Sequence, residues 1–169
     1  VLNGAAQIVD RLHALQQLRA SGVELIVADG GSTDGTAHLA EALADRVVTA
    51  PRGRAAQMNA GAAVSQGQVL LFLHADTTLP ENAAQALLAA IDSGESWGRF
   101  DVRIDGAQPL LRIVEHMMNW RSRLTGIATG DQAIFVIRDI FERVGGYADL
   151  LLMEDIALSA ALKRITPPV

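Results

Sequence analysis

The most constraining feature of this sequence is an apolar run from Val69 to Leu73 that leads directly into His74, Ala75 and Asp76. An unbroken apolar run of this length predicts a strand buried on both faces, as in the parallel sheets of α/β proteins. Ligands of such sheets bind beyond the carboxyl ends of the strands. His74 and Asp76 lie two residues apart, so in extended backbone both side chains would face such a ligand.

Strands and helices alternate along the chain as expected for βαβ units, which predicts a single α/β domain over residues 1–169. We expect a doubly wound, mostly parallel, Rossmann-like sheet flanked by helices, in which the alternating strand 100–104 is a candidate for an antiparallel position. The expected strands cover 23–28, 46–50, 69–73, 100–104 and 133–137, and the expected helices cover 8–18, 36–44, 54–63, 80–91, 109–124, 138–144 and 154–164. Asn3 is the expected N-cap of the first helix. From the residues at its two ends, we expect the chain to lack most of the first strand and the C-terminal region of the domain.

Composition limits the classes of function that the chain could have. A net charge of −5 argues against non-specific binding of nucleic acid, although a cation could still offset the phosphates of a nucleotide. The absence of cysteine excludes disulfides and thiolate chemistry. No apolar run reaches 18 residues and no signal peptide is recognisable, so we expect a cytoplasmic protein without a transmembrane segment.

Asp29 stands where an expected strand becomes a glycine-rich loop. A carboxylate in this place could accept a hydrogen bond from a nucleotide base or ribose hydroxyl. Ser32, Thr33 and Asp34 follow it, and we expect these three to cap the next helix. The loop is neither a G-x-G-x-x-G nor a Walker A sequence, which disfavours dehydrogenases and ATPases.

Residues that could bind a diphosphate and a divalent cation follow later in the sequence. Arg54, near a helix start, has the forked guanidinium that suits a diphosphate, although a solvated arginine is an equal alternative, and Asn59 lies about a turn beyond it. Asp76, with His74 as a further candidate, could hold Mg²⁺ or Mn²⁺, which prefer oxygen ligands. The alternative is a turn in which Asp76 merely caps the backbone.

Glu154 and Asp155 open the last expected helix, directly after four apolar residues. One acid there is explained by the helix dipole, and the other could serve as a general base. The helix 109–124 carries an apolar stripe edged by Arg112, Arg121 and Arg123, and the stripe consists of Leu110, Leu111, Ile113, Val114, Met117, Met118 and Leu124. We expect the stripe to pack into the core, with peripheral contact to the inner face of a membrane as the alternative.

Together these residues resemble the inverting family 2 glycosyltransferases of bacterial type, which have the GT-A fold. The resemblance covers nearly the whole chain, and each motif alone is weak while their order and spacing are specific. It is carried by Leu2-Asn3, Asp29–Thr36, Gly53–Gly61, His74–Asp76, Gly98–Asp101, Gly130–Gln132 and Glu154-Asp155.

The resemblance implies transfer of a sugar, as in a hexosyltransferase, from a nucleoside-diphosphate sugar (UDP-linked by expectation) to a hydroxyl of an unknown saccharide, lipid-linked or small-molecule acceptor. It assigns Asp155 as the catalytic base and Asp76 as the ligand of Mg²⁺ or Mn²⁺. The donor is expected to contact Asn3, Asp29, Arg54, Asn59, Ala75 and Asp76, and the acceptor is expected near Asp131, Gln132 and Glu154.

Two departures from the family pattern stand out: His74 replaces an aspartate in the metal motif, and Gly4 stands where a glutamate is expected. Two rival functions stay open at this point. A nucleotidyltransferase would need a basic glycine-rich loop after the first strand, which residues 2–6 lack. A module that binds nucleotide sugars without catalysis is disfavoured by the presence of both Asp76 and Asp155.

Overall fold

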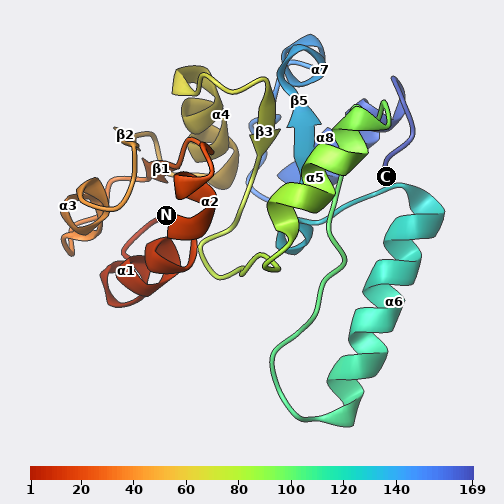
Figure 1. Cartoon of the computed structure of the whole chain (residues 1–169), viewed down its shortest axis with the longest axis horizontal. Coiled ribbons are helices and arrows are strands. Elements are labelled where there is room, and N and C mark those ends of the chain that lie inside the picture. Colours follow the sequence, from red (N-terminus) through yellow and green to blue (C-terminus); the bar gives the residue numbers. More distant parts are fainter.

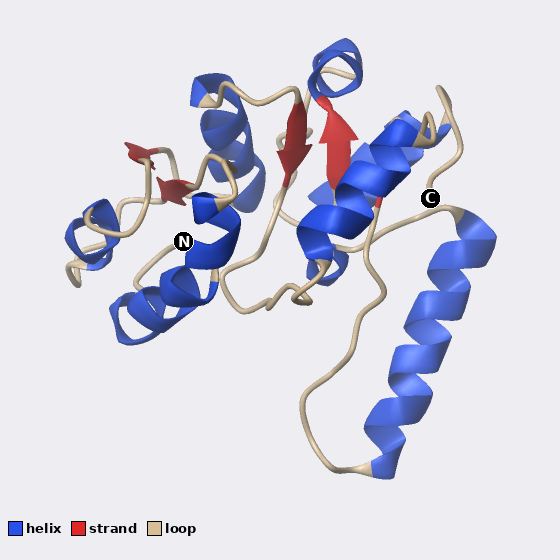
Figure 2. Cartoon of the chain, viewed as in Figure 1, coloured by secondary structure: helices blue, strands red, loops and turns tan.

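The computed structural model describes residues 1–169 and contains eight α-helices, one 3₁₀ turn and five short strands (Figures 1 and 2). The helices are α1 (Ala5–Ala14), α2 (Gln16–Ala20), α3 (Thr36–Glu41), α4 (Arg54–Val64), α5 (Ala83–Asp92), α6 (Pro109–Thr125), α7 (Arg138–Arg143) and α8 (Glu154–Lys163), with the turn η1 (Gly130–Gln132). The strands are β1 (Ile26–Asp29), β2 (Arg46–Thr49), β3 (Val69–Leu71), β4 (Trp97–Gly98) and β5 (Phe135–Ile137).

The strands form two small sheets. β1 and β2 pair in parallel, and the second sheet has the order β3-β5-β4 with both pairings antiparallel. β3 and β4 therefore run in the same direction, as the crossover through α5 requires, and β5 returns between them. The expectation of one mostly parallel sheet was wrong. Val136 in β5 is fully buried, and such burial predicts a central strand without specifying the direction of its neighbours.

Two hydrophobic clusters correspond to the two sheets. The smaller one joins Ile8 and Leu12 of α1 to Val27 of β1 and Ala40 of α3. The larger one lies around the second sheet and includes an aromatic group: the ring of Phe72 lies 5.1 Å from that of Phe141 and 5.0 Å from that of Tyr147. Distances of this size are typical of favourable aromatic pairs. This cluster supports the loops that follow β3 and α7.

Residues 100–104 do not form the expected strand, although the expected alternation of burial is present. Val102 and Ile104 are half-buried while their neighbours are exposed. The backbone N–H of Val102 donates to Asn119 Oδ1 over 2.9 Å, and that of Ile104 donates to Glu115. Side chains of α6 therefore satisfy the backbone groups that a neighbouring strand would otherwise pair.

Four expectations for the N-terminal third also need correction. The first helix is divided at Leu15 into α1 and α2, and α3 ends at Glu41 rather than Ala44. Asn3 is not an N-cap: it has φ +47°, and its Oδ1 accepts from the N–H of Thr33. The capping residue of α3 is Gly35, while Asp34 accepts from the N–H groups of Thr36 and Ala5.

Candidate functional site

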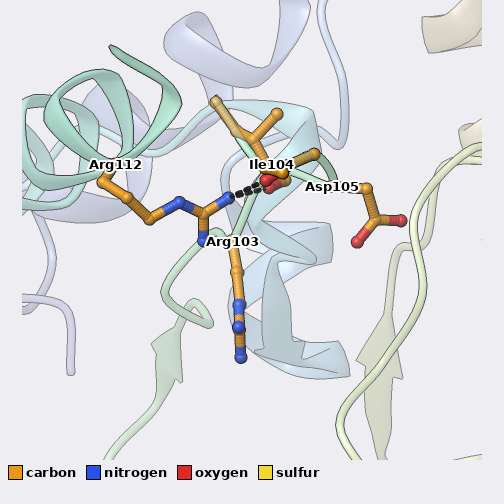
Figure 3. Close-up of a pocket in the computed structure, with 6 residues that line it drawn as sticks. Arg103, Ile104, Asp105 and Arg112 are labelled. Carbon is orange, nitrogen blue, oxygen red and sulfur yellow. Dashed lines mark hydrogen bonds between the residues drawn. The ribbon is translucent and has the colours of Figure 1, made fainter. Parts of the chain in front are cut away.

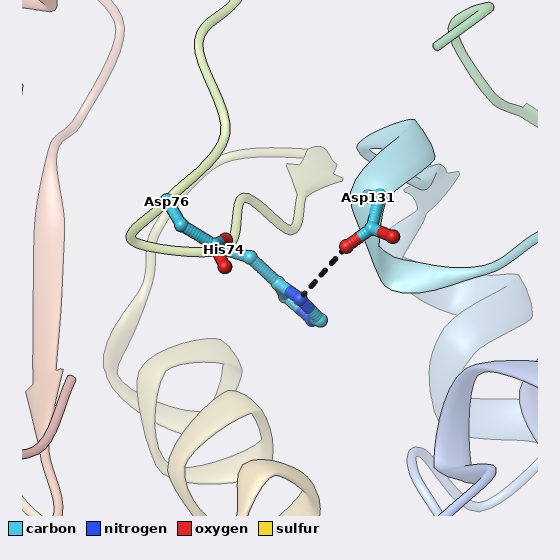
Figure 4. Close-up of side chains that lie close together, drawn as sticks. All are labelled: His74, Asp76 and Asp131. Carbon is cyan, nitrogen blue, oxygen red and sulfur yellow. Dashed lines mark ion pairs between the residues drawn. The ribbon is translucent and has the colours of Figure 1, made fainter. Parts of the chain in front are cut away.

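His74 and Asp76 leave β3 on a turn and meet Asp131 of η1 (Figure 4). The ligand atoms of these three side chains lie within 4.8 Å of one another, and His74 Nδ1 is 4.0 Å from Asp131 Oδ1. Asp76 and Asp131 are exposed, while the side chain of His74 is only 14% exposed. An imidazole nitrogen and two carboxylates within reach of one point form a donor set that a divalent cation such as Mn²⁺ accepts.

The second nitrogen of His74 faces the predicted base. His74 Nε2 lies 3.8 Å from Asp155 Oδ2 and has no hydrogen-bond partner. The absence of a side chain at residue 130 permits this approach, because a Cβ on Gly130 would overlap the His74 ring and lie 2.6 Å from Asp155 Oδ2. Gly130 is therefore required for the present arrangement of His74 and Asp155.

Glu154 and Asp155 are buried at the N-terminus of α8. Met153, which precedes them, has φ +70°, a conformation that residues other than glycine adopt at a cost of about 1–3 kcal/mol. The positive end of the ten-residue helix lies beside both acids and favours their charged forms. The four apolar residues before the acids, Leu150 to Met153, are exposed.

The pKa of Asp155 is raised above its ordinary value, mainly because the carboxyl is buried. The neighbouring His74 lowers this pKa, Glu154 raises it and Arg54 lowers it, in decreasing order of effect. Asp155 Oδ1 has no hydrogen-bond partner. A buried carboxylate with a free oxygen and a raised pKa has the properties required of a general base.

Arg54 and Glu154 were predicted in different roles, and in the structure they are neighbours. Arg54 Nη1 lies 3.6 Å from Glu154 Oε1, with Glu154 buried and Arg54 mostly exposed. Arg54 is therefore close enough to Glu154 for an ion pair, while most of its side chain faces solvent, where a diphosphate could bind it.

Tyr147 is a site residue that the sequence analysis missed. Its hydroxyl is buried near the Asp155 carboxylate, and burial together with the nearby Asp155 charge raises the pKa of Tyr147 well above its ordinary value. Only its place after the Gly145-Gly146 turn could have drawn attention to it, and that signal is too common to be useful.

Asn59 holds Tyr147 in place. Its side-chain amide donates to the Tyr147 carbonyl over 2.9 Å and accepts from the Tyr147 N–H over 2.9 Å. Both ends of the amide are thus engaged by backbone. The predicted contact of Asn59 with the donor stays a prediction, but this bracing is the role that its contacts support.

Asp29 is buried within its own loop. It accepts hydrogen bonds from the N–H groups of Gly31 and Ser32 at 3.0 and 2.8 Å, and from the Ser32 hydroxyl. Burial raises the pKa of Asp29, but these hydrogen bonds together outweigh it and leave the pKa below its ordinary value. The expected contact of Asp29 with the donor stays a prediction.

The other predicted residues differ in their surroundings. Ala75 is exposed beside Asp76. Gln132 is buried, and its Oε1 accepts from the Thr129 N–H over 3.1 Å, which stabilises η1. Gln132 Nε2 has no partner. Of the three residues predicted on the acceptor side, Asp131 faces solvent, while Gln132 and Glu154 are buried.

Comparison with known proteins gives this arrangement a family. The family described as Glycosyl transferase family 2 matches residues 1–144. The chain therefore belongs to glycosyl transferase family 2. It is 29% identical over 161 residues to "Probable glycosyltransferase YdaM" of Bacillus subtilis (strain 168), which covers 81% of this chain and 38% of that protein.

Solved structures show the same fold at lower identity. A mannosyltransferase from Pyrobaculum calidifontis in complex with GDP-Man and Mn²⁺ is 21% identical with a TM-score of 0.74, covering 99% of this chain and 52% of that one. Glucosyl-3-phosphoglycerate synthase from Mycobacterium tuberculosis, in complex with Mn²⁺, UDP-glucose and phosphoglyceric acid, is 20% identical with a TM-score of 0.66, covering 94% and 60%. The α/β GT-A-like fold is thereby confirmed, and the chain spans between about a third and two thirds of these relatives.

Replacing Asn59 by alanine tests the bracing role. The two hydrogen bonds to Tyr147 would be lost, and we expect the free energy of unfolding to fall by about 1–3 kcal/mol. Urea denaturation measures this, and calorimetric titration of UDP measures donor binding alongside. A loss of UDP affinity at unchanged stability would instead assign Asn59 to the donor site.

Proposed function

We propose that this protein transfers a sugar from a nucleoside-diphosphate sugar to an acceptor hydroxyl with inversion, using Asp155 as the base. The observation that carries the proposal is the buried Asp155 carboxylate, with one unpaired oxygen and a raised pKa, opposite His74. Membership in glycosyl transferase family 2 supports the reaction class and disfavours the nucleotidyltransferase alternative.

The residues suggest a single displacement. Asp155 accepts the proton of the acceptor hydroxyl as its oxygen bonds to the anomeric carbon. The bond from that carbon to the diphosphate oxygen breaks, and the nucleoside diphosphate leaves with the electron pair. Arg54, which is mostly exposed, can then stabilise the charge on the departing diphosphate. A single displacement needs no nucleophilic side chain and inverts the configuration at the anomeric carbon.

A divalent cation fits the donor set of this site. Asp76 is its principal proposed ligand, and His74 and Asp131 are close enough to contribute. When bound, the cation would offset the negative charge of the diphosphate. The Mn²⁺ complexes of the two structural relatives support this cofactor, and their GDP-Man and UDP-glucose support a nucleotide sugar as donor. UDP is our first choice of nucleotide.

The rest of the donor site is proposed around the loop of Asp29. Asn3 hydrogen-bonds to this loop through Ser32 and Thr33, so the two predicted donor residues belong to one local structure. Asp29 would exchange part of its internal hydrogen bonding for a nucleotide base or ribose. Ala75, exposed next to Asp76, would contact the nucleotide through its backbone.

A thermal-shift screen tests donor binding directly. Nucleotide sugars with different bases are added with and without Mn²⁺, and a ligand of the folded state raises the melting temperature. We expect a shift with a nucleotide sugar only when Mn²⁺ is present. If no nucleotide sugar shifts the melting temperature under either condition, the proposed donor site is wrong.

Removal of Asp76 should abolish the effect of the cation. We expect UDP to bind wild type more tightly in Mn²⁺ than in EDTA, because the diphosphate charge is otherwise uncompensated. In Asp76→Ala the two affinities should become similar. Titration calorimetry measures all four values, and four equal affinities would remove the cation from donor binding.

A further inference from the structure

Helix α6 turns its polar face toward the molecule. Glu115 is buried and accepts from the Ile104 N–H, and Asn119 exchanges two hydrogen bonds of 2.9 Å with the backbone of Val102. These contacts attach the helix to residues 101–105. The polar side chains of an amphipathic helix usually face solvent, but on α6 these two are hydrogen-bonded to the backbone of the rest of the chain.

Most of the predicted apolar stripe of α6 is consequently exposed, contrary to the expectation that it packs into the core, and only Leu111 and Met118 of that stripe are half-buried. Figure 1 shows α6 at the outer side of the molecule with no other helix beside it. The exposed side chains are Leu110, Ile113, Val114, Met117, Trp120 and Leu124, between 38% and 66% exposed. At 100° per residue they occupy an arc of about 120° on the helix surface. We call these six residues the α6 apolar face.

By the same helical geometry, Arg121 lies within the arc of the α6 apolar face, while Arg112 and Arg123 lie toward the polar side of the helix. The helix carries Arg112, Arg121 and Arg123, and its one acid, Glu115, is buried. Arg123 pairs with Asp101 but is still 66% exposed, and Arg112 pairs with Glu115. Cations therefore exceed acids along the exposed sides of α6, although the whole chain has a net charge of −5.

A hollow beside the helix continues the same pattern. It lies between α6 and residues 103–107 and is lined by Arg103 and Arg112, with Asp105 as its one acid (Figure 3). None of the residues of the candidate catalytic site lines it. Arg112 already donates to the carbonyls of Ile104 and Gly106, so Arg103 is the guanidinium of this hollow that is suited to the phosphate of a lipid headgroup.

We propose that the α6 apolar face docks this protein onto an anionic lipid bilayer. The helix would lie in the plane of the interface, with its apolar side chains among the acyl chains and its arginines among the headgroups. No helix of the structure has both the length and the apolar composition to cross a bilayer. A second copy of the chain is the weaker candidate, because it would bring identical arginines and the same net charge to the contact.

Intrinsic fluorescence tests the docking without any substitution. The chain has two tryptophans, and Trp97 is fully buried while Trp120 is 66% exposed. A blue shift of the emission on addition of vesicles therefore reports entry of Trp120 into an apolar environment. We expect the shift with vesicles that contain phosphatidylglycerol and little or none with pure phosphatidylcholine. No shift with either kind of vesicle would overturn the proposal.

A matched pair of variants tests the face itself. Ile113 on α6 and Leu88 on α5 are both 57% exposed. Ile113→Glu is expected to weaken partition onto phosphatidylglycerol vesicles about tenfold or more, and Leu88→Glu to leave it unchanged. Arg121→Gln should weaken it about fivefold. Flotation measures partition, and circular dichroism verifies that each variant is folded.

Two results would overturn the assignment. If Leu88→Glu weakens partition as much as Ile113→Glu, the effect is one of general surface charge. If wild type is a dimer that Ile113→Glu dissociates while vesicle binding is unchanged, the α6 apolar face is an interface between two copies. Analytical ultracentrifugation measures the second case.

Discussion

Replacement of Asp155 by asparagine is expected to lower the rate of sugar transfer by about 10²–10⁴-fold. Asparagine keeps the size of the side chain and much of its hydrogen bonding, but it cannot accept the proton of the acceptor hydroxyl. Donor affinity should survive, because the proposed base contacts the acceptor and not the diphosphate. Rates with the donor found by thermal shift, and calorimetric titration of UDP, measure the two effects separately.

Glu154→Gln is the matched control for this prediction. Glu154 is equally buried and adjacent, but its contact is with Arg54. On a helix the two side chains diverge by about 100°, so they cannot both face the acceptor. The control should slow transfer less than Asp155→Asn. A variant Asp155→Asn that transfers sugar at the wild-type rate would show that another group acts as the base.

The pH dependence of transfer provides an independent readout. A base must be deprotonated to act, and burial raises the pKa of Asp155 above the ordinary range of an aspartate. Activity should therefore fall as the pH drops through this raised pKa, at a higher pH than an exposed aspartate would give. The residual activity of Asp155→Asn should lack this acidic limb. An identical limb in the variant would assign the titration to another group.

Local pattern was enough to predict which residues form the main elements. The apolar run before His74 does contain β3, which ends at Leu71 rather than at residue 73, and helices begin near Arg54, Pro109 and Glu154 as expected. These features depend on neighbours in sequence, such as periodicity and capping. The family and the GT-A-like fold were likewise predictable, because they rest on the order of several motifs along the chain.

Pairing and orientation could not be predicted in the same way. The direction of β5 depends on strands distant in sequence, and its buried residues look alike in a parallel or an antiparallel sheet. The outward turn of the α6 apolar face depends on Asn119 and Glu115 binding the backbone of residues 102 and 104. Tyr147 and the pairing of Arg54 with Glu154 are contacts between distant segments, which a single sequence does not reveal.

Gly130→Ala is expected to disrupt the candidate site through a single methyl group. The added Cβ would overlap the His74 ring and lie 2.6 Å from Asp155 Oδ2, so at least one of these side chains must move. Overpacking of this kind costs about 1–3 kcal/mol of stability. A displacement of about 1 Å in a catalytic group can lower the rate about 10²-fold. Urea denaturation and transfer rates measure both effects.

Gly61→Ala is the matched control. Gly61 lies in the interior of α4, and the nearest atoms to its added Cβ, on Ile26 and Ala28 of β1, are 3.9 Å away. Alanine is the better helix former there, and the variant should gain about 0.5–1 kcal/mol of stability without loss of activity. The double variant Gly130→Ala/His74→Ala then identifies the cause. If the His74 ring is what the methyl group displaces, the two stability losses will be less than additive, because removal of the ring relieves the overlap. Additive losses would show that His74 and Gly130 are not in direct steric conflict, and that the close approach of His74 to Asp155 does not depend on the glycine.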